Sequence, residues 1–241
     1  MNRIWTVDII FPVFHGNIEI LEKSTQELLN YLTKIKGPYE FKIIISINGK
    51  KAEKIIEKAK LISQTYDSVI YTYSEKQGKG YGVLNPWKNS SADILTYMDV
   101  DLSTSLESFD KLLYEIREGA DLAIGSRYLP TSKINRSLLR YVMSKIYHVF
   151  FINKFLRLPI KDVQCGFKAI NKSAFDQLYF YISNYEFFFE AEMLFLAHGL
   201  KMKIIEVPVI WKEAKVSGVR IFQTSLLFII GVIKLKFRKV F

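Results

Sequence analysis

Short apolar runs alternate with longer segments of helical spacing through the first half of the chain. The runs lie at 6–11, 41–47, 68–74, 93–98 and 122–125, and helical patterns follow the first four of them. The first run reaches Pro12, which we expect to stop it. This rhythm is typical of strands in a mostly parallel sheet joined by helical crossovers. We therefore expect an α/β, Rossmann-like fold with a mostly parallel central sheet flanked by helices.

The second half has a less regular pattern. Helical spacing covers 136–156, 173–181, 187–198 and the segment from Phe222 onward, and a strand pattern at 203–211 is broken by Pro208. No repeat or low-complexity linker divides the chain, so we expect one domain over 1–220 and an amphipathic interfacial helix over 221–241. The longest uncharged stretch, 221–233, is shorter than the roughly 20 residues that a membrane-spanning helix needs.

The positive charge is concentrated in two segments. The chain has 34 Lys and Arg against 24 Asp and Glu, a net charge of +10. Residues 132–161 hold seven basic residues and 214–241 hold six, with no acid in either segment. A near-neutral body with basic, aromatic-rich segments favours an anionic ligand or membrane surface over nucleic acid. The single cysteine, Cys165, excludes an intramolecular disulfide and a cysteine metal cluster, and we expect it to be buried.

Two carboxylates follow the predicted strand at 93–98. Asp99 and Asp101 lie at the edge where open α/β sheets bind ligands. Residues two apart in extended chain point the same way, so both carboxylates are expected to face one ligand. Such hard oxygen ligands suit Mg²⁺ or Mn²⁺ held together with substrate phosphates. The alternative is that Asp101 caps the next helix, although Ser103 or Thr104 could also do so.

Three groups of cations accompany these carboxylates. Lys79 lies in the turn 77–80, whose glycines would let backbone N–H groups approach a phosphate or sugar. Arg127 follows the fifth apolar run, and its planar fork suits a diphosphate. On the helix at 136–156 a polar stripe recurs every four residues, with Lys145 beside it; its members are Arg136, Arg140, Ser144 and His148. The alternatives are an ordinary turn, a surface arginine and a solvated helix face.

Two further segments carry polar groups. The segment 162–168 reads as a loop with polar groups around Gly166. Glu190 and Glu192 lie in an apolar helix, where acids tend to be paired or functional, so we expect one of them to touch the site.

Together these motifs resemble a known family. In order they are FPVF, ISINGK, KQGKGYGV, YMDVDLST, IGSRYL, DVQCGFKAINK, EFFFEAEMLFLAHG and IIEVPVIWKE. The set is similar to the inverting GT-A-fold family 2 glycosyltransferases, and among them to the dolichyl-phosphate (polyprenyl-phosphate) sugar synthases. The resemblance runs from Val7 to Arg220. The segment DVQCGFK is more similar to the glucosyltransferase branch than to the mannose branch.

The resemblance implies roles for individual residues. Pro12, Phe14, Asn48, Lys79, Asp99 and Gln164 would bind the nucleotide sugar, and Asp99 and Asp101 would hold Mg²⁺ or Mn²⁺. Arg136, Arg140, Ser144 and Lys145 would bind the acceptor phosphate. The catalytic set would be Asp101, Arg127, Arg140 and Lys145. The chain departs from the family's usual Asn-Glu and Asp-Asp-Gly-Ser at 15–17 and 47–50, which alters the expected nucleoside pocket.

The implied activity is inverting transfer of a hexose to a polyprenyl or dolichyl phosphate. UDP-glucose is favoured as the donor, with GDP-mannose as the alternative. The enzyme would lie in the cytoplasm, peripheral on the cytosolic membrane face. A phosphate acceptor is already an anionic nucleophile and needs no general base. The alternative is a family 2 enzyme that acts on a soluble sugar or glycan hydroxyl, with Asp162 or Glu190 as base. A nucleic-acid-binding module would leave Asp99 and Asp101 unexplained.

Overall fold

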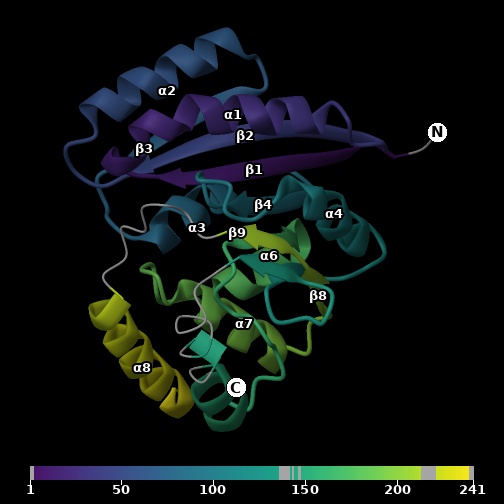
Figure 1. Ribbon diagram of the computed structural model, residues 1–241, viewed down its shortest axis with the longest axis vertical. Coiled ribbons are helices and arrows are strands. Elements are labelled where there is room, and N and C mark those ends of the chain that lie inside the picture. The colour runs from purple at the N-terminus through teal and green to yellow at the C-terminus, as the bar shows by residue number, and fades with distance from the viewer. Residues whose placement is uncertain (1–2, 136–141, 143, 146–147, 213–220, 239–241) are drawn as a thin grey trace.

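The computed structural model describes residues 3–135, 142, 144–145, 148–212 and 221–238. Its main feature is a seven-stranded sheet with the order β3-β2-β1-β4-β7-β5-β8, in which only β7 runs antiparallel to its neighbours (Figure 1). The strands are β1 (Trp5–Val13), β2 (Tyr39–Asn48), β3 (Val69–Ser74), β4 (Ile94–Met98), β5 (Leu122–Ser126), β7 (Phe167–Asn171) and β8 (Ile204–Pro208). A small parallel pair, β6 (Lys133–Asn135) and β9 (Ile210–Lys212), lies beside it.

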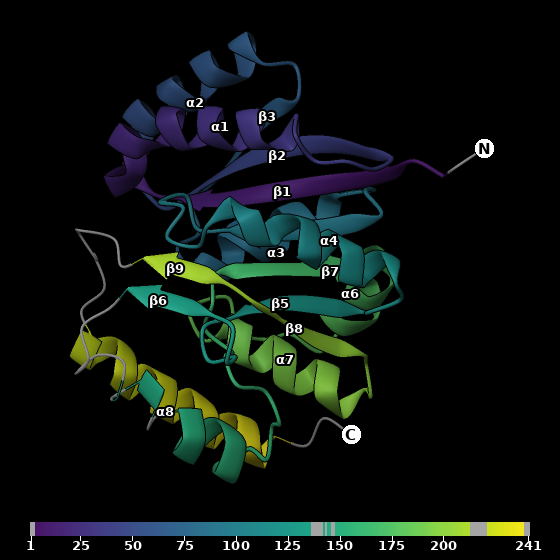
Figure 2. The same cartoon turned by 45° about the vertical axis from the view of Figure 1, so that its right-hand side comes forward.

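Helices cover both faces of the sheet (Figure 2). One core cluster joins the sheet to α1 (Ile18–Leu32), α2 (Glu53–Thr65) and α4 (Phe109–Arg117). The other joins it to α3 (Lys79–Asn89), α6 (Lys172–Tyr179), α7 (Phe189–Gly199) and α8 (Ile221–Phe237). Side chains of β1 alternate between them, since Ile9 and Phe11 enter the first cluster and Ile10 enters the second. Each such buried side chain contributes about 1.5–3 kcal/mol. The expected α/β architecture is confirmed.

Two strands differ from the sequence expectation. β1 continues through Pro12 to Val13, because β4 pairs with β1 only as far as Tyr97 and leaves Pro12 with β2 as its neighbour. The strand β7 was not expected, because Lys168 interrupts its apolar pattern. Pro208 ends β8 and separates it from β9, as expected.

The predicted long helix at 136–156 is described only in part. Val142 and residues 144–145 are helical, and His148–Phe155 forms a π-helix, η3. Arg136 and Arg140 lie outside the described residues.

The C-terminal helix α8 packs on the body of the protein. Phe228, Val232 and Leu235 are buried in the cluster that contains α7. Arg238 just beyond the helix donates to the buried carboxylate of Glu192 at 2.5 Å. The division of the chain at residue 220 stays a prediction, but the helix shares the core of the domain that precedes it.

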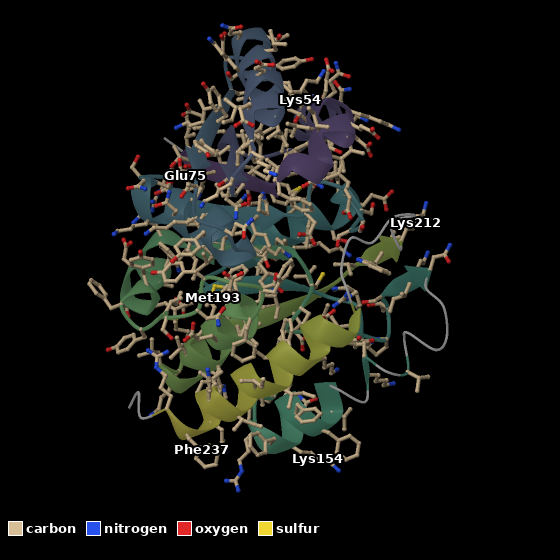
Figure 3. All side chains as sticks on the ribbon, turned by 90° about the vertical axis from the view of Figure 1, so that its left-hand side faces the viewer. Lys54, Glu75, Lys154, Met193, Lys212 and Phe237 are labelled. Carbon is tan, nitrogen blue, oxygen red and sulfur yellow. The ribbon has the colours of Figure 1, made fainter. Side chains whose placement is uncertain are left out.

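The outer side of α8 is also apolar. Figure 3 shows α8 alongside η3, with Phe237 and Lys154 at the ends of the two helices. Among the described residues, the large apolar side chains exposed on the pair are Val149, Phe150, Phe155, Ile230, Ile233 and Phe237. In the described part of the chain, no helix is both long enough and apolar enough to span a membrane.

We expect Leu235→Ala to lower the free energy of unfolding by about 2–5 kcal/mol, because it removes a buried side chain from the packed face of α8. Ile233→Ala on the exposed face is the matched control and should change it by about 0.5 kcal/mol or less. Urea denaturation measures both. Equal effects would show that α8 is not docked in solution as it is here.

Candidate active site

The parallel strands end at one edge of the sheet, the carboxyl edge. From β1 the chain first adds β2 and β3 on one side and then adds β4 on the other side. β2 lies on one side of β1 and β4 on the other, and the crevice at such a switch point is where open α/β sheets bind ligands. This topology brings Pro12 and Asn48 together. A Cβ added at Gly82 of α3 would lie 3.2 Å from Pro12 Cβ and 3.2 Å from Asn48 Oδ1.

The glycine turn before α3 is closed by protein. Asn48 Nδ2 donates to the Gly78 carbonyl oxygen at 2.7 Å, and Tyr81 N donates to the Tyr185 carbonyl oxygen at 3.0 Å. A Cβ at Gly78 would lie 2.3 Å from that Tyr185 oxygen, and one at Gly80 would lie 2.6 Å from the Tyr185 carbonyl carbon. The backbone of Tyr185 therefore fills the space where side chains at 78 and 80 would lie, and the expectation that these glycines admit a phosphate or sugar stays a prediction.

Lys79 places its ammonium between two carboxylates. Its Nζ lies 2.9 Å from Asp99 Oδ1 and 2.9 Å from Glu190 Oε1. Glu190 also accepts from the Tyr97 hydroxyl at 2.7 Å and lies 3.4 Å from Lys168 Nζ. We call these five residues the Glu190 cluster. Glu190, one of the two acids of α7, thus contacts Lys79, and its contact with a functional site stays a prediction.

The ionised forms in the cluster support one another. Burial alone would raise the pKa of Glu190, but Lys168 and Lys79 outweigh it and lower that pKa to about 2. Burial opposes the charge of Lys79, yet Asp99 and Glu190 raise the pKa of Lys79 above its usual value. Burial, followed by the charges of Glu190 and Asp99, raises the pKa of Tyr97 well above its usual value. The Tyr97 hydroxyl therefore stays a donor.

Asp99 and Asp101 occupy a turn instead of an extended strand. Leu102 N donates to the Asp99 carbonyl oxygen at 3.0 Å, so the expectation that both side chains point the same way because the chain is extended is wrong. Asp101 Oδ1 accepts from Ser103 N at 2.9 Å. The next helix, η2 (Leu106–Ser108), is capped by Ser105 instead of Asp101.

Gly166 makes room for the Asp99 carboxylate. A Cβ at Gly166 would lie 2.1 Å from Asp99 Oδ2, and the Gly166 carbonyl oxygen accepts from Asp99 N at 3.1 Å. The loop at 162–166, which enters β7, therefore sets the position of Asp99.

The two carboxylates fit a divalent metal that is shared with a substrate. The Asp99 side chain is 43% exposed, and Asp101 is exposed. Burial raises the pKa of Asp99, with Lys79 acting against it and Glu190 adding to it. Among the residues that the structure describes, no group of three or more His, Cys, Asp or Glu could hold a metal. A metal here would take further oxygen ligands from a diphosphate and water, as Mg²⁺ commonly does.

Arg127 is held in a buried ion pair at the end of β5. Its Nε donates to Asp162 Oδ2 at 2.7 Å and one Nη donates to Oδ1 at 2.9 Å, in the bidentate geometry of strong pairs. Asp162 also accepts from the backbone N–H groups of Arg127 and Gln164. Burial opposes the charge, but Asp162 raises the pKa of Arg127 above its usual value. Trp211 lies over the guanidinium at 5.5 Å.

Ser144 links the predicted acceptor helix to this end of β5. Its Oγ lies 2.7 Å from the hydroxyl of Tyr128, next to Arg127. Lys145 is exposed, Gln164 is half-buried and Phe14 is 50% exposed. The structure thus gathers two groups, one around Asp99 and one around Arg127.

Sequence reasoning missed Lys168, Tyr128, Tyr185 and Trp211. Only Lys168 carries a usable signal, since a lysine flanked by Phe167 and Ala169 in a short apolar segment indicates a buried, paired cation.

Cys165 is buried, as expected, with its Sγ 3.8 Å from Thr104 Oγ1. Burial raises the pKa of the Cys165 thiol to about 12.

Comparison with known proteins decides the family. The model of the family described as Glycosyl transferase family 2 matches residues 8–179, which is more than half of the chain. The chain belongs to glycosyl transferase family 2. The expected GT-A fold is confirmed by solved structures. A glucosyl-3-phosphoglycerate synthase from Mycobacterium tuberculosis in complex with Mn²⁺, UDP and phosphoglyceric acid has a TM-score of 0.68 and 14% identity, covering 98% of this chain and 80% of that one.

Three curated relatives of this family 2 chain align with most of its length. Glycosyltransferase AglD of Haloferax volcanii is 28% identical over 89% of this chain and 35% of that protein. The dolichol-phosphate mannosyltransferase of Pyrococcus furiosus is 28% identical over 90% of this chain and 61% of that protein. The dolichyl-phosphate beta-glucosyltransferase of Dictyostelium discoideum is 27% identical over 96% of this chain and 74% of that protein. The chain thus spans less than two thirds of the first two relatives.

We expect Gly166→Ala to weaken Mn²⁺ binding by about 10–100-fold, because the added Cβ displaces the Asp99 carboxylate. Titration of Mn²⁺ in the presence of UDP, followed by electron paramagnetic resonance, measures it. Glu57→Ala, at an exposed position of α2, is the control. Unchanged Mn²⁺ affinity in folded Gly166→Ala would remove Asp99 from the proposed ligands.

We expect the Cys165 thiol to be unreactive toward a disulfide reagent at pH 8, because its thiolate is scarce at a pKa of about 12 and its side chain is buried. The same reagent in urea should label one thiol per chain, since Cys165 is the single cysteine. Rapid labelling of the native protein would contradict the packing of the loop at 162–166.

Proposed function

We propose that this chain transfers a hexose from a nucleotide diphosphate sugar to a polyprenyl phosphate, with inversion at the sugar. Glucose and UDP are favoured over mannose and GDP, since the loop DVQCGFK resembles the glucosyltransferase branch. Curated relatives carry the names of dolichyl-phosphate glucosyl- and mannosyltransferases.

The state of the two candidate bases carries this proposal. Asp162 is fully buried and accepts from Arg127 side-chain and backbone donors and from Gln164 N. Glu190 is buried between two lysines, and its pKa of about 2 makes it a very weak base. A hydroxyl acceptor needs a base to remove its proton, whereas a phosphate acceptor does not. The arrangement therefore favours phosphate over a soluble sugar or glycan hydroxyl.

The chemistry then involves no proton transfer to the protein. An oxygen of the acceptor phosphate attacks C1 of the hexose, and the bond from C1 to the diphosphate oxygen breaks, with its electron pair leaving on the diphosphate. A bound Mg²⁺ or Mn²⁺, held by Asp99 and Asp101, would neutralise charge on that leaving group. Pro12, Phe14, Asn48, Lys79 and Gln164 are proposed to bind the donor.

The second cationic group would receive the acceptor. We assign Arg136, Arg140, Ser144 and Lys145 to the acceptor phosphate. The contact between Ser144 and Tyr128 supports this, because it brings the helix to the β5 edge. Asp162 would hold the Arg127 guanidinium in one orientation there, which is the preorganisation that stabilises developing charge.

A peripheral position on the cytosolic membrane face completes the proposal. Exposed Ile230, Ile233 and Phe237 could enter the interface, and exposed Lys234 and Lys236 could add about 1 kcal/mol each at an anionic surface.

The test is transfer of radiolabelled sugar to dolichyl phosphate in detergent, followed by organic extraction. We expect label from UDP-glucose in the organic phase, dependent on Mn²⁺ or Mg²⁺ and lost by at least about a hundredfold in Asp101→Asn. Asp110→Asn, an exposed carboxylate of α4, is the matched control and should keep full transfer.

Two other results of this assay would correct the proposed donor or the proposed acceptor. Label from GDP-mannose alone would keep the reaction class and correct the donor. Transfer only to a water-soluble glycan, abolished by Glu190→Gln or Asp162→Asn, would overturn the phosphate acceptor.

A further inference from the structure

Lys79 is shared between an inner and an outer carboxylate. Its Nζ lies 2.9 Å from Glu190 Oε1, in the core, and 2.9 Å from Asp99 Oδ1, at the carboxyl edge. The Lys79 side chain is 15% exposed and that of Asp99 is 43% exposed. The Lys79 ammonium is therefore ion-paired with Asp99, one of the two carboxylates that the proposed function assigns to the metal.

The charges of the four residues joined through Lys79 and Glu190 balance one another before Asp101 is counted. Asp99 and Glu190 carry two negative charges, and Lys79 and Lys168 carry two positive ones. A divalent cation added alone at Asp99 and Asp101 would leave these groups with an excess of one positive charge even with the Asp101 carboxylate counted, and it would lie beside the Lys79 ammonium. Such repulsion is strong where water screens poorly. A diphosphate that arrives with the metal would restore the balance.

We propose that Lys79 is the resident counter-ion of Asp99, and that it makes divalent-metal binding depend on simultaneous binding of a nucleotide diphosphate. The inference rests on the proposed function only in placing a metal at Asp99 and Asp101. It adds a role for Lys79 before the donor arrives, namely competition with the bare metal.

The structure provides a place for the ammonium once Asp99 turns to the metal. Glu190 stays in contact with Lys79 because two further groups hold its carboxylate: the Tyr97 hydroxyl donates to Oε1, which Lys79 also contacts, and Lys168 lies beside Oε2. The backbone around Lys79 packs closely on Tyr185, because Tyr81 N donates to the Tyr185 carbonyl oxygen at 3.0 Å and no room for a Cβ remains at Gly78 or Gly80. Lys79 therefore remains beside the metal and within reach of a diphosphate bound there.

The effects of nucleotide on metal binding and of metal on nucleotide binding are thermodynamically linked. If nucleotide diphosphate strengthens metal binding, metal strengthens nucleotide binding by the same factor. Removal of the Lys79 charge should then act in opposite directions, tightening metal alone and weakening the coupling between metal and nucleotide. A residue with only a structural role would not produce these opposite changes.

The experiment titrates Mn²⁺ into the full chain, without nucleotide and with saturating UDP or GDP, and follows free Mn²⁺ by electron paramagnetic resonance. We expect the wild type to bind Mn²⁺ weakly alone and at least about tenfold more tightly with one of the nucleotides. Lys79→Met should bind Mn²⁺ alone about tenfold more tightly than the wild type, with most of the nucleotide effect lost. Its unfolding transition confirms that it is folded.

Two variants separate charge from other effects. Lys79→Arg keeps the charge and should retain weak binding of Mn²⁺ alone. Lys88→Met removes an exposed charge from the far end of the same helix and should match the wild type.

The outcomes distinguish this inference from the proposed function. Nucleotide-dependent Mn²⁺ binding that is lost in Asp101→Asn, together with unchanged binding of Mn²⁺ alone by folded Lys79→Met, would overturn the role of Lys79 and leave the proposed function standing. An absence of Mn²⁺ binding by the wild type with both nucleotides would overturn the metal site and this inference together.

Discussion

The carboxylate of Glu190 supports the whole carboxyl edge at β4. It is buried in α7 with two ammonium groups and a tyrosine hydroxyl around it, and each of these groups fixes something else. Lys79 fixes the position of Asp99, and Lys168 donates to the Cys165 carbonyl oxygen in the loop that carries Gly166. Removal of one member of a buried ion pair typically costs about 3–5 kcal/mol, because the remaining charge stays uncompensated. Glu190 thus sets the position of Asp99 through Lys79 and Lys168, without itself needing to contact a ligand.

The pairing of buried carboxylates with cations also limits which chemistry the site can perform. Asp162 is committed to Arg127 and Glu190 to its lysines, so the acids nearest the sheet edge act as holders of cations. Asp99 also pairs with Lys79, but both Asp99 and Asp101 reach the surface. A site built this way suits reactants that bring their own negative charge, and the exposed apolar and basic side chains of η3 and α8 suit a reactant that is held at a membrane.

The sequence was sufficient for what depends on local pattern. Strand rhythm predicted the layered sheet, and the position of Asp99 and Asp101 after an apolar run predicted their place at its edge. Contacts between distant residues were out of reach, since Lys79 and Glu190 are 111 positions apart. The prediction of an extended chain at Asp99 and Asp101 was wrong because these residues form a turn. The strand β7 was missed because the buried Lys168 interrupts its apolar pattern. The glycines at 78 and 80 were recognised as close-approach positions, but sequence could not tell a protein backbone from a ligand.

The contact between Arg238 and Glu192 limits how the protein can be dissected. Glu192 also accepts from the backbone N–H groups of Ser183 and Asn184, in the loop that leads to Tyr185. A truncation that stops before Arg238 would leave that carboxylate buried without its cation, and one that removes α8 would also expose the side chains beneath it. Membrane affinity and folding therefore cannot be separated by cutting the chain. They can be separated by changing single outward side chains of the helix, which leaves its inner face closed.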